Sequence, residues 1–470
     1  MRDPLDPKPS VPAQSVPAQS VPVQSVPAQS VTAQSVPAQS VSAHSARFIT
    51  GFAKTLFYAR MSVGSALHFL PQVRRLGGFR KYVRLLMRAA RLTRIFYVHK
   101  LLRLPDGRHK LDFYLPAYPS EAFFRTMETK LAEVPPRPAT VVLSVTRACR
   151  YRCPHCYQGK DSAEEMPLER LLEVVRELRE FGITAWAVEG GDPLLRFDRL
   201  LPVLQELSGS EVWVNSTGMG ADPEKLAAMK AAQVVGIMSS VHFTDPLRHD
   251  AFTGVPGSWE RTMDFLRDCR NAGFLTGFNT VLTDEQILDG EIDRVMDLAR
   301  ERQCDYIQLI HPKSCGRWLD QEFAAEKHER AKEIACAAQR RYNSARERHA
   351  PILAAQVYEE SPEMLGCTCG GIDRFYVGSS GEVQPCEFLN ISFGNLTREP
   401  FSTIYGRMRK VFAIPCENWP CCEKASEIAR AFAENGVQTA PLPWELTEKL
   451  TENWEMGTPT KVYSDIGIYS

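Results

Sequence analysis

Apolar and polar residues alternate along most of this chain in a regular order. Short apolar runs with the length of buried strands occupy residues 139–145, 183–188, 211–215, 234–241, 274–282 and 305–310. Helical patterns lie between and after them, near residues 165–181, 196–208, 222–232, 257–272, 290–303 and 324–347. Six β–α units predict a parallel α/β sheet, and they are too few for a complete eightfold barrel. We therefore expect a partial barrel or an open sheet, with its chemistry at the carboxyl ends of the strands.

The segments outside this alternation differ in composition. Residues 10–44 repeat a five-residue SVPAQ unit, whose prolines and small polar residues cannot build a core. From Phe48 to Leu104 the pattern predicts two helices parted by Gly77-Gly78. Around Arg374–Leu389 a GSSG turn between apolar runs predicts a β-hairpin appended after the barrel. The last 45 residues are expected to form a short helix near 423–434 and a poorly patterned tail.

These changes divide the chain into five expected parts. They are a disordered repeat tail at 1–45, a basic helical arm and linker at 46–138, the barrel at 139–350, a cysteine-rich extension at 351–425, and a C-terminal helix and tail at 426–470.

Charge is unevenly distributed although the formal net charge is zero. Residues 46–110 hold 15 lysines and arginines against one acid, Asp106. In the second arm helix a basic face and a neighbouring apolar stripe are expected, formed by Arg80, Arg84, Arg88 and Arg91 and by Phe79, Val83, Leu86 and Ala90. Two interpretations stay open: an arm docked on the acidic remainder of the protein, or a surface for anionic lipid headgroups. Nothing else in the chain supports binding to nucleic acid.

The longest uncharged run in the arm, Met61–Val73, is too short to span a bilayer, so no transmembrane helix is predicted. The start of the chain has no secretory signal pattern, and 13 cysteines then indicate a reducing compartment with metal-bound thiolates. We expect a cytoplasmic protein, with peripheral contact at the inner membrane face under the lipid interpretation.

Cys149, Cys153 and Cys156 form the most informative motif, C-x3-C-x2-C, directly after the first strand. Three thiolates on one loop can hold three corners of a [4Fe–4S] cluster and leave the fourth iron open to a small molecule. Structural zinc and iron–sulfur sites usually take four protein thiolates. The alternatives are a zinc knuckle that lacks one ligand, and three unrelated core cysteines.

Together with the next strand ends, this loop resembles the radical S-adenosylmethionine (radical SAM) superfamily. The EGGDP segment at 189–193 is similar to the GGEP motif of that family, with Asp192 in place of Glu, and the NSTG segment at 215–218 resembles its T-N-G segment. The stretch that begins SSVH at 239–242 is similar to one in peptide-modifying members, with His242 in place of Asp. The resemblance implies a partial (β/α)6 barrel and the SAM-contacting residues Tyr157, Glu189, Gly190, Gly191, Asp192, Pro193, Asn215, Thr217, Ser240, Asn279 and Gln308.

A second group of cysteines lies in the extension and comprises Cys367, Cys369, Cys386, Cys416, Cys421 and Cys422. The spacing C-x11-G-x4-C from Cys369 to Cys386 resembles the start of the SPASM or twitch extension, which binds auxiliary [4Fe–4S] clusters. The later C-x4-C-C departs from the full SPASM pattern, so we expect one auxiliary cluster. The resemblance implies that its ligands are Cys369, Cys386, Cys416 and one of Cys421 or Cys422. A zinc site or disulfides are the alternatives.

The resemblance implies an enzyme that cleaves SAM reductively at a [4Fe–4S] cluster. A 5′-deoxyadenosyl radical then abstracts hydrogen from the substrate, and a one-electron reductant such as flavodoxin or ferredoxin supplies the electron. The SPASM-like extension favours a peptide or protein side chain as substrate, whereas the basic arm favours a lipid or other membrane-associated small molecule. A non-catalytic iron–sulfur or zinc-binding protein is the alternative of another class, and the open-iron spacing argues against it.

Overall fold

A nine-stranded sheet organises the fold, in the order β10-β9-β8-β7-β6-β5-β4-β11-β12. The structure is a computed structural model that describes residues 47–132, 135–319, 321, 325–455 and 457–469, so the predicted repeat tail at 1–45 lies outside the described residues. The strands are β4 (Thr140–Ser144), β5 (Ala185–Glu189), β6 (Glu211–Asn215), β7 (Gly236–Ser240), β8 (Leu275–Val281), β9 (Tyr306–Ile310), β10 (Ile352–Ala355), β11 (Arg374–Val377) and β12 (Val383–Gln384). All neighbouring pairs are parallel except β11 and β12.

Helices follow the strands in the predicted alternation. They are α5 (Leu168–Phe181), α6 (Phe197–Glu206), α7 (Pro223–Ala231), α8 (Pro246–Thr253), α9 (Ser258–Asn271), α10 (Asp284–Leu288), α11 (Glu291–Glu301), α12 (Ala325–Tyr342) and α13 (Gln356–Glu359). The six predicted strands and the helices between them are confirmed, and the fold is a partial (β/α)6 barrel extended at both edges.

Alternation within the strands separates the helix-facing side from the inside of the barrel. In β4, Val141 and Leu143 pack in the core against the helices, whereas Val142 packs inside the barrel with Ala187 and Tyr376. All five residues of β4 are buried, as expected for a parallel strand covered on both faces.

Aromatic side chains fill the barrel near the amino ends of its strands. The Phe113 ring lies 4.6 Å from that of Trp213 and 5.8 Å from that of Tyr306. Phe113 comes from the predicted linker, which also places Lys110 Nζ 2.7 Å from the buried carboxylate of Glu211. The linker therefore closes the barrel opposite the strand ends that carry the motifs.

Both edges of the sheet differ from the sequence-based expectation. β10 adds a parallel strand beside β9 that the apolar pattern did not indicate. The predicted hairpin exists as β11 and β12, with Tyr376 opposite Gln384, but β11 also pairs in parallel with β4. The hairpin is thus part of the main sheet rather than an appendage, because pairing with β11 satisfies the open edge of β4.

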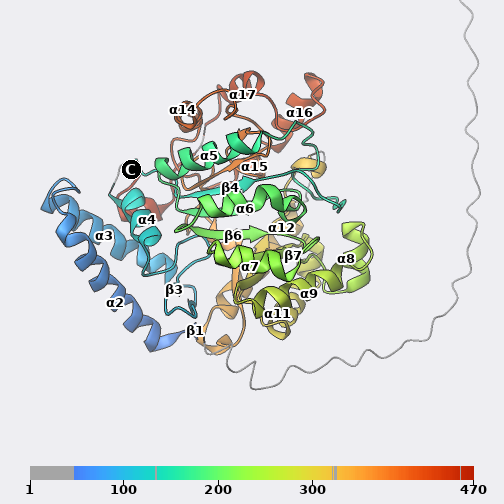
Figure 1. Ribbon diagram of the computed structural model, residues 1–470. Helices are drawn as coiled ribbons and strands as arrows, with labels where there is room; N and C mark the ends of the chain where they lie inside the picture. The colour runs from blue at the N-terminus through green and yellow to red at the C-terminus, as the bar shows by residue number, and fades with distance from the viewer. Residues whose placement is uncertain (1–46, 133–134, 320, 322–324, 456, 470) are drawn as a thin grey trace, which may run out of the picture. The chain divides into compact units, whose positions relative to one another are not determined.

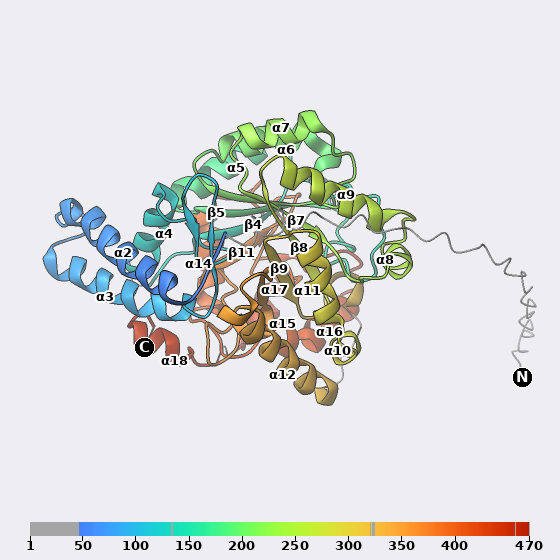
Figure 2. The same ribbon diagram turned by 90° about the horizontal axis from the view of Figure 1, so that it is seen from below.

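The arm forms the predicted two helices, α2 (Gly51–Phe69) and α3 (Phe79–Phe96), which lie side by side in both views (Figures 1 and 2). Gly77 and Gly78 part them, with φ values of 86° and 106° that favour glycine. The strands β1 (Phe48–Ile49), β2 (Leu101–Arg103) and β3 (His109–Lys110) form a small sheet, and α4 (Glu121–Leu131) follows.

The predicted faces of α3 need correction. Phe79 is 65% exposed, and the buried face consists of Tyr82, Leu85 and Arg88. Arg88 does not belong to an exposed basic face, because its guanidinium donates to the Leu131 carbonyl at 2.7 Å and to the Gly467 carbonyl. Periodicity located the helix but misjudged its rotation, since a buried arginine satisfied by carbonyls cannot be recognised from sequence.

The C-terminal region is more ordered than predicted. It contains α14 (Phe401–Val411), α15 (Pro420–Glu423), α16 (Ala425–Glu434), α17 (Trp444–Thr451) and α18 (Lys461–Ile466). The expected poorly patterned tail therefore holds two short helices, whose ordering comes from tertiary packing such as Tyr463 and Ile466 against the arm core. Among the described residues, no helix is long and apolar enough to cross a membrane.

Candidate active site

The three motif cysteines lie together on the loop that follows β4. Cys149 is exposed, and Cys153 and Cys156 are half-buried. Burial raises the pKa of Cys149 to about 11 and that of Cys153 to about 12, and the nearby Cys156 adds to both shifts. The free thiols therefore hold their protons near neutral pH, and a bound metal would displace them.

A Gly-Arg pair after β9 fixes the backbone of this cysteine loop. Arg317 donates from its backbone N–H to the Cys156 carbonyl at 3.2 Å and from its guanidinium to the Cys153 carbonyl at 3.0 Å. Gly316 has a φ of 54°, and a Cβ there would collide with backbone atoms of Cys156 and Tyr157. The Gly-Arg pair after β9 thus holds the cysteine loop at the carboxyl end of the barrel.

The glycines after β5 serve the same loop. A Cβ on Gly190 would collide with the Thr146 carbonyl, and one on Gly191 would collide with the carbonyls of Arg147 and Ala148. The N–H of Gly191 donates to the Thr146 carbonyl at 2.7 Å. These glycines let the two loops pack directly on each other, while both also line the cavity described next.

A cavity of about 710 Å³ opens at the carboxyl ends of the strands and reaches the three cysteines. Of the residues predicted to contact SAM, the cavity lining includes Tyr157, Glu189, Gly190, Gly191, Asn215, Thr217, Ser240, Asn279 and Gln308. Asp192 and Pro193 do not line it. Asp192 is buried behind the wall, where it accepts hydrogen bonds from the Ser216 hydroxyl at 2.7 Å and from the Thr217 hydroxyl, so its position suits bracing of the neighbouring loop.

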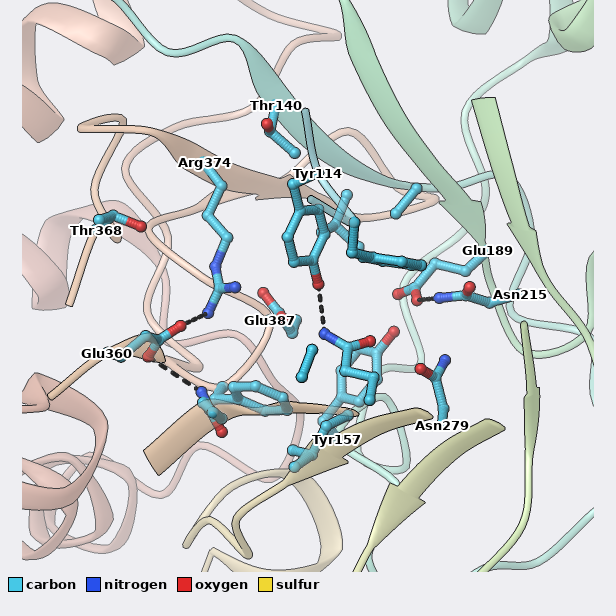
Figure 3. Close-up of a pocket in the computed structure, with 18 of the residues that line it drawn as sticks. Tyr114, Thr140, Tyr157, Glu189, Asn215, Asn279, Glu360, Thr368, Arg374 and Glu387 are labelled. Atoms are coloured by element: carbon cyan, nitrogen blue, oxygen red, sulfur yellow. Dashed lines mark hydrogen bonds and ion pairs between the residues drawn. The ribbon is translucent and has the colours of Figure 1, made fainter. Parts of the chain in front are cut away.

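Three strand ends present buried acceptor oxygens to this cavity (Figure 3). Glu189 Oε1, Asn215 Oδ1 and Asn279 Oδ1 have no hydrogen-bond partner within the protein. The other oxygen of Glu189 accepts from Asn215 Nδ2 at 2.9 Å, and burial raises the pKa of Glu189 to about 8. An unpartnered buried acceptor costs free energy, so this wall suits a ligand that brings hydrogen-bond donors.

His242 adds a donor to the same wall. Its Nδ1 accepts from the Val281 N–H at 3.2 Å, so the proton of the neutral ring lies on Nε2. Burial lowers the pKa of His242 well below its usual value, so the ring stays neutral. His155 stacks on Phe252 with ring centroids 5.0 Å apart.

The second cysteine group separates into two parts. Cys367, Cys369, Cys386 and Cys416 are all buried, and Cys367 and Cys416 exchange backbone hydrogen bonds of 2.7 and 3.1 Å. The Cys367, Cys386 and Cys416 thiols all raise the pKa of Cys369, so the four lie close together. Cys421 is buried nearby, whereas Cys422 is exposed and lies beside Lys313 and His328. The predicted ligand set omitted Cys367, which pairs directly with Cys416.

The thiol spacing can be compared with the needs of zinc. Tetrahedral zinc with Zn–S bonds near 2.3 Å places its sulfur ligands about 3.8 Å apart. Among the described residues, no group of three thiols has all its sulfurs within 4.8 Å of one another. Among the described residues, the thiols are thus not arranged with the compact sulfur spacing of a bound zinc ion.

Comparison with known proteins agrees with this geometry. The family model described as the Radical SAM superfamily matches residues 143–299, which include the cysteine loop and strands β5 to β8. Residues 143–299 therefore form a radical SAM domain. Members of this superfamily are enzymes that use a [4Fe–4S] cluster and SAM.

Several curated relatives of this radical SAM enzyme are named for tetrapyrrole synthesis. The AdoMet-dependent heme synthase of Methanosarcina barkeri is 24% identical over 289 residues, which cover 57% of this chain and 82% of the relative. The enzyme of the same name from Nitratidesulfovibrio vulgaris is 24% identical over 365 residues, covering 70% and 96%. The Fe-coproporphyrin III synthase of Methanosarcina barkeri is 26% identical over 297 residues, covering 56% and 73%. Among solved structures, Streptococcus suis SuiB bound to S-adenosylmethionine aligns with a TM-score of 0.49 and 15% identity, covering 61% of this chain and 70% of SuiB.

Sequence reasoning missed the far wall of the cavity, where the two edges of the sheet approach each other. Arg374 at the start of β11 donates to Glu360 Oε1 at 2.8 Å, and its Nε has no hydrogen-bond partner within the protein. Tyr114 from the linker accepts from Gln308 Nε2 at 2.6 Å. The aromatic run DFYL at 112–115 was the available signal, but nothing in the sequence pattern indicated that the linker enters the site.

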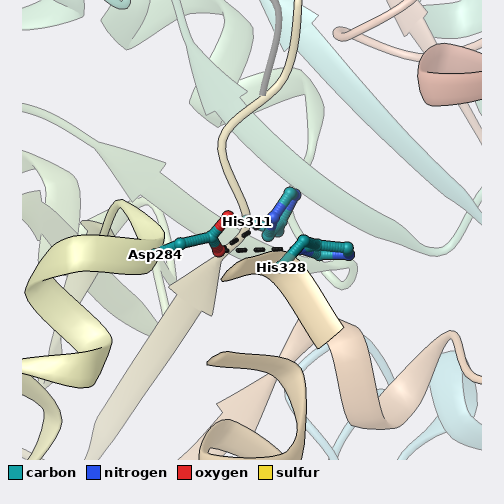
Figure 4. A group of neighbouring side chains, drawn as sticks. All are labelled: Asp284, His311 and His328. Carbon is teal, nitrogen blue, oxygen red and sulfur yellow. Dashed lines mark ion pairs between the residues drawn. The ribbon is translucent and has the colours of Figure 1, made fainter. Parts of the chain in front are cut away.

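Two further groups among the described residues bring three ligand-type side chains within 4.8 Å of one another. In the first, Asp284 Oδ1 lies 3.6 Å from His311 Nε2 and 3.5 Å from His328 Nδ1 (Figure 4). Lys313 Nζ lies 3.3 Å from the other nitrogen of His311, and this ammonium opposes a second cation nearby. In the second, His99 Nε2 lies 3.2 Å from Glu359 Oε1 beside Asp112. In the first group burial lowers the pKa of His311 to about 4, so this ring is neutral beside Asp284. In the second, burial opposes protonation of His99 but Glu359 raises its pKa, so an ion pair accounts for that group.

Proposed function

We propose that this radical SAM enzyme acts on an amphiphilic small molecule that carries a carboxylate. The observation that carries the proposal is the cavity of about 710 Å³, which runs from the cysteine loop to an apolar end and includes a buried arginine. Small-molecule sites typically measure about 300–1,000 Å³ and are largely apolar, with a few convergent polar groups.

The three thiolates of Cys149, Cys153 and Cys156 would hold the first [4Fe–4S] cluster. When bound, the cluster and SAM supply the 5′-deoxyadenosyl radical that removes a hydrogen atom from the substrate. The chain's own contribution is positioning. The unpartnered oxygens of Glu189, Asn215 and Asn279 suit the amino group and ribose hydroxyls of SAM, and the buried walls exclude water from the radical.

An auxiliary [4Fe–4S] cluster in a SPASM-like extension is the second part of the proposal. We choose Cys367, Cys369, Cys386 and Cys416 as the ligand set, because all four are buried and the other three thiols raise the pKa of Cys369. Cys421, which is also buried and interacts with Cys367, is the alternative fourth ligand. This set replaces Cys421 or Cys422 with Cys367. Cys386 also contacts Glu387, a cavity residue, at 3.1 Å, so an electron could pass between the cluster and the cavity wall over a short path.

The polar far wall supports a carboxylate-bearing substrate. Arg374 has a free Nε, and Lys130 lies in the same part of the cavity, paired with Asp373. Beyond them the lining becomes apolar, with Leu92, Phe96, Met127, Leu131, Ile466 and Ile468. Tetrapyrroles, for which the relatives are named, combine an apolar ring with carboxylates and are the first candidates.

The test measures 5′-deoxyadenosine release by anaerobically reconstituted protein with SAM and dithionite, in the presence of different candidate substrates. Fe-coproporphyrin III should stimulate 5′-deoxyadenosine release at least about 10-fold over the rate without substrate, and a new product should appear by mass spectrometry. Stimulation only by a peptide would support the peptide-modifying alternative, which the SPASM-like spacing of Cys369 and Cys386 favours, and would overturn the small-molecule proposal.

A one-electron reductant such as flavodoxin or ferredoxin is the proposed electron source for the first cluster. Peripheral contact with a membrane through the basic arm is also proposed, because residues 46–110 carry 15 lysines and arginines against a single acid.

A further inference from the structure

The outer face of α2 is apolar, although it faces away from the core of the protein. Its buried face consists of Lys54, Tyr58, Met61, Ser65 and Phe69. The opposite face carries four exposed apolar side chains, and Leu70, directly after α2, continues them. These five residues are defined here as the α2 stripe: Phe52 (82% exposed), Leu56 (42%), Val63 (60%), Leu67 (64%) and Leu70 (50%). Their spacings of four, seven, four and three residues place them in one row along the helix.

Such a row departs from the usual pattern for a surface helix, which presents polar residues to water. Scattered single apolar residues on a surface need no explanation, but a contiguous row of exposed apolar side chains marks a contact with another protein or with a membrane. Phe79, at the start of the neighbouring helix α3, is a further exposed apolar side chain, at 65%.

The charges around the stripe favour a membrane as the partner. The outer face of α3 presents Arg80, Arg84 and Arg91, and Arg60 and Arg74 are exposed close to the stripe. Asp106 is the one acid of residues 46–110. Arg75 is already paired with Glu128 at 2.7 Å and contributes less. An apolar helix beside a row of arginines matches the acyl and phosphate layers of an anionic bilayer.

We propose that the α2 stripe inserts into the headgroup–acyl boundary of an anionic membrane, with the arginines of α3 on the lipid phosphates. This inference rests on the proposed function in one respect, the route of the substrate. The inner side of α3 contributes Leu92 and Phe96 to the apolar end of the cavity. The same helix pair therefore lies between the bilayer and the apolar end of the site, and an amphiphilic substrate can pass from one to the other with its apolar part shielded from water.

The experiment uses the full-length reconstituted protein and vesicles of 70% phosphatidylcholine and 30% phosphatidylglycerol, with pure phosphatidylcholine vesicles for comparison. Wild-type protein should float with the anionic vesicles, and raising the salt from 0.1 to 0.5 M should weaken binding because it screens the arginines. The double variant Phe52→Ser/Leu67→Ser should bind at least about 10-fold more weakly. Leu247→Ser is the matched control, since Leu247 is 80% exposed on α8, far from the arm in sequence, and it should bind like the wild type.

A second pair of variants tests the basic row. Arg80→Gln/Arg84→Gln/Arg91→Gln should reduce binding to anionic vesicles several-fold and remove most of its salt dependence. Arg330→Gln/Arg398→Gln, which alters exposed arginines outside the arm, should leave both unchanged.

The results separate this inference from the proposed function. Release of 5′-deoxyadenosine from SAM in solution should be the same in the wild type and in Phe52→Ser/Leu67→Ser. Failure of the wild type to float, or equal flotation of the stripe variant and Leu247→Ser, would overturn the membrane inference and leave the enzyme assignment untouched. A concentration-dependent dimer that the stripe variant loses, without flotation of the wild type, would assign the stripe to self-association and also overturn it.

Discussion

At the scale of single residues, the cysteines of the barrel loop and those of the extension are expected to respond differently to substitution. Cys153→Ala should remove the first cluster and abolish SAM cleavage, because three thiolates are the minimum set for that cluster. Cys386→Ala should lower iron by about four atoms per chain while SAM cleavage without substrate continues. Iron analysis and 5′-deoxyadenosine release on the same samples check both, with Cys336→Ala, a half-buried thiol on α12, as the control. Full SAM cleavage by Cys153→Ala would show that the cysteine loop is wrongly assigned.

Glu189 offers a second test at this scale. Its free oxygen is proposed to accept from the amino group of SAM, and hydrogen bonds to charged groups contribute about 1.5–3 kcal/mol. Glu189→Ala, which removes both acceptor oxygens, should therefore weaken SAM binding about 10- to 100-fold in equilibrium binding to the reconstituted protein. Glu173→Ala removes an exposed carboxylate on α5 and should have no effect. Unchanged SAM affinity in Glu189→Ala would place the amino group elsewhere.

Single residues also show where sequence reasoning succeeds. The cysteine loop, the glycines after β5 and the strand-end residues Asn215, Asn279 and Gln308 were expected at one site, and they line one cavity because parallel strands end together. Arg374, Glu360 and Tyr114 were not expected, because they come from an edge strand, a loop and a linker whose positions depend on tertiary packing. Cys367 was named in the second cysteine group but not in the predicted ligand set, because its backbone pairing with Cys416 depends on tertiary packing.

At the scale of elements, packing of the β5 loop on the cysteine loop predicts a specific defect. Gly191→Ala would push a methyl group into two carbonyl oxygens, and overpacking of this kind typically costs about 1–3 kcal/mol. We expect a lower melting temperature together with poor retention of the first cluster, measured as iron per chain after desalting.

Gly406→Ala is the matched control for that substitution. Gly406 lies in α14 with open space around its Cα, so alanine should stabilise the helix by about 0.5–1 kcal/mol and leave iron content unchanged. Normal cluster retention in Gly191→Ala would contradict the role assigned to this loop contact.

The elements also show the limits of periodicity. Strands β4 to β9 and their helices were predictable because long alternating patterns report burial directly. β10 and β11 are four residues each and become strands by pairing with exposed edges. α17 and α18 are too short to show a clear period, and α3 was correctly located but rotated in the prediction because Arg88 is buried.

At the scale of the whole molecule, the cavity joins the barrel, the linker, the extension and the arm. Arg374→Lys keeps a charge opposite Glu360 but removes the free Nε, so we expect substrate-dependent turnover to fall at least about 10-fold, in line with a lost charged hydrogen bond. SAM cleavage without substrate should be unaffected. Arg407→Lys, which alters an arginine paired with Glu399 outside the cavity, serves as the control. Equal loss in both assays would indicate a defect in folding rather than in substrate recognition.

We propose that the three-cysteine loop and the strand ends around it form a working radical SAM centre, with one auxiliary cluster behind the cavity. The most direct test of this proposal is 5′-deoxyadenosine release from SAM by anaerobically reconstituted protein with dithionite, with iron, sulfide and zinc counted on the same sample. The account predicts release together with about eight irons per chain, the count for two [4Fe–4S] clusters. No release, with zinc bound in place of iron, would contradict it.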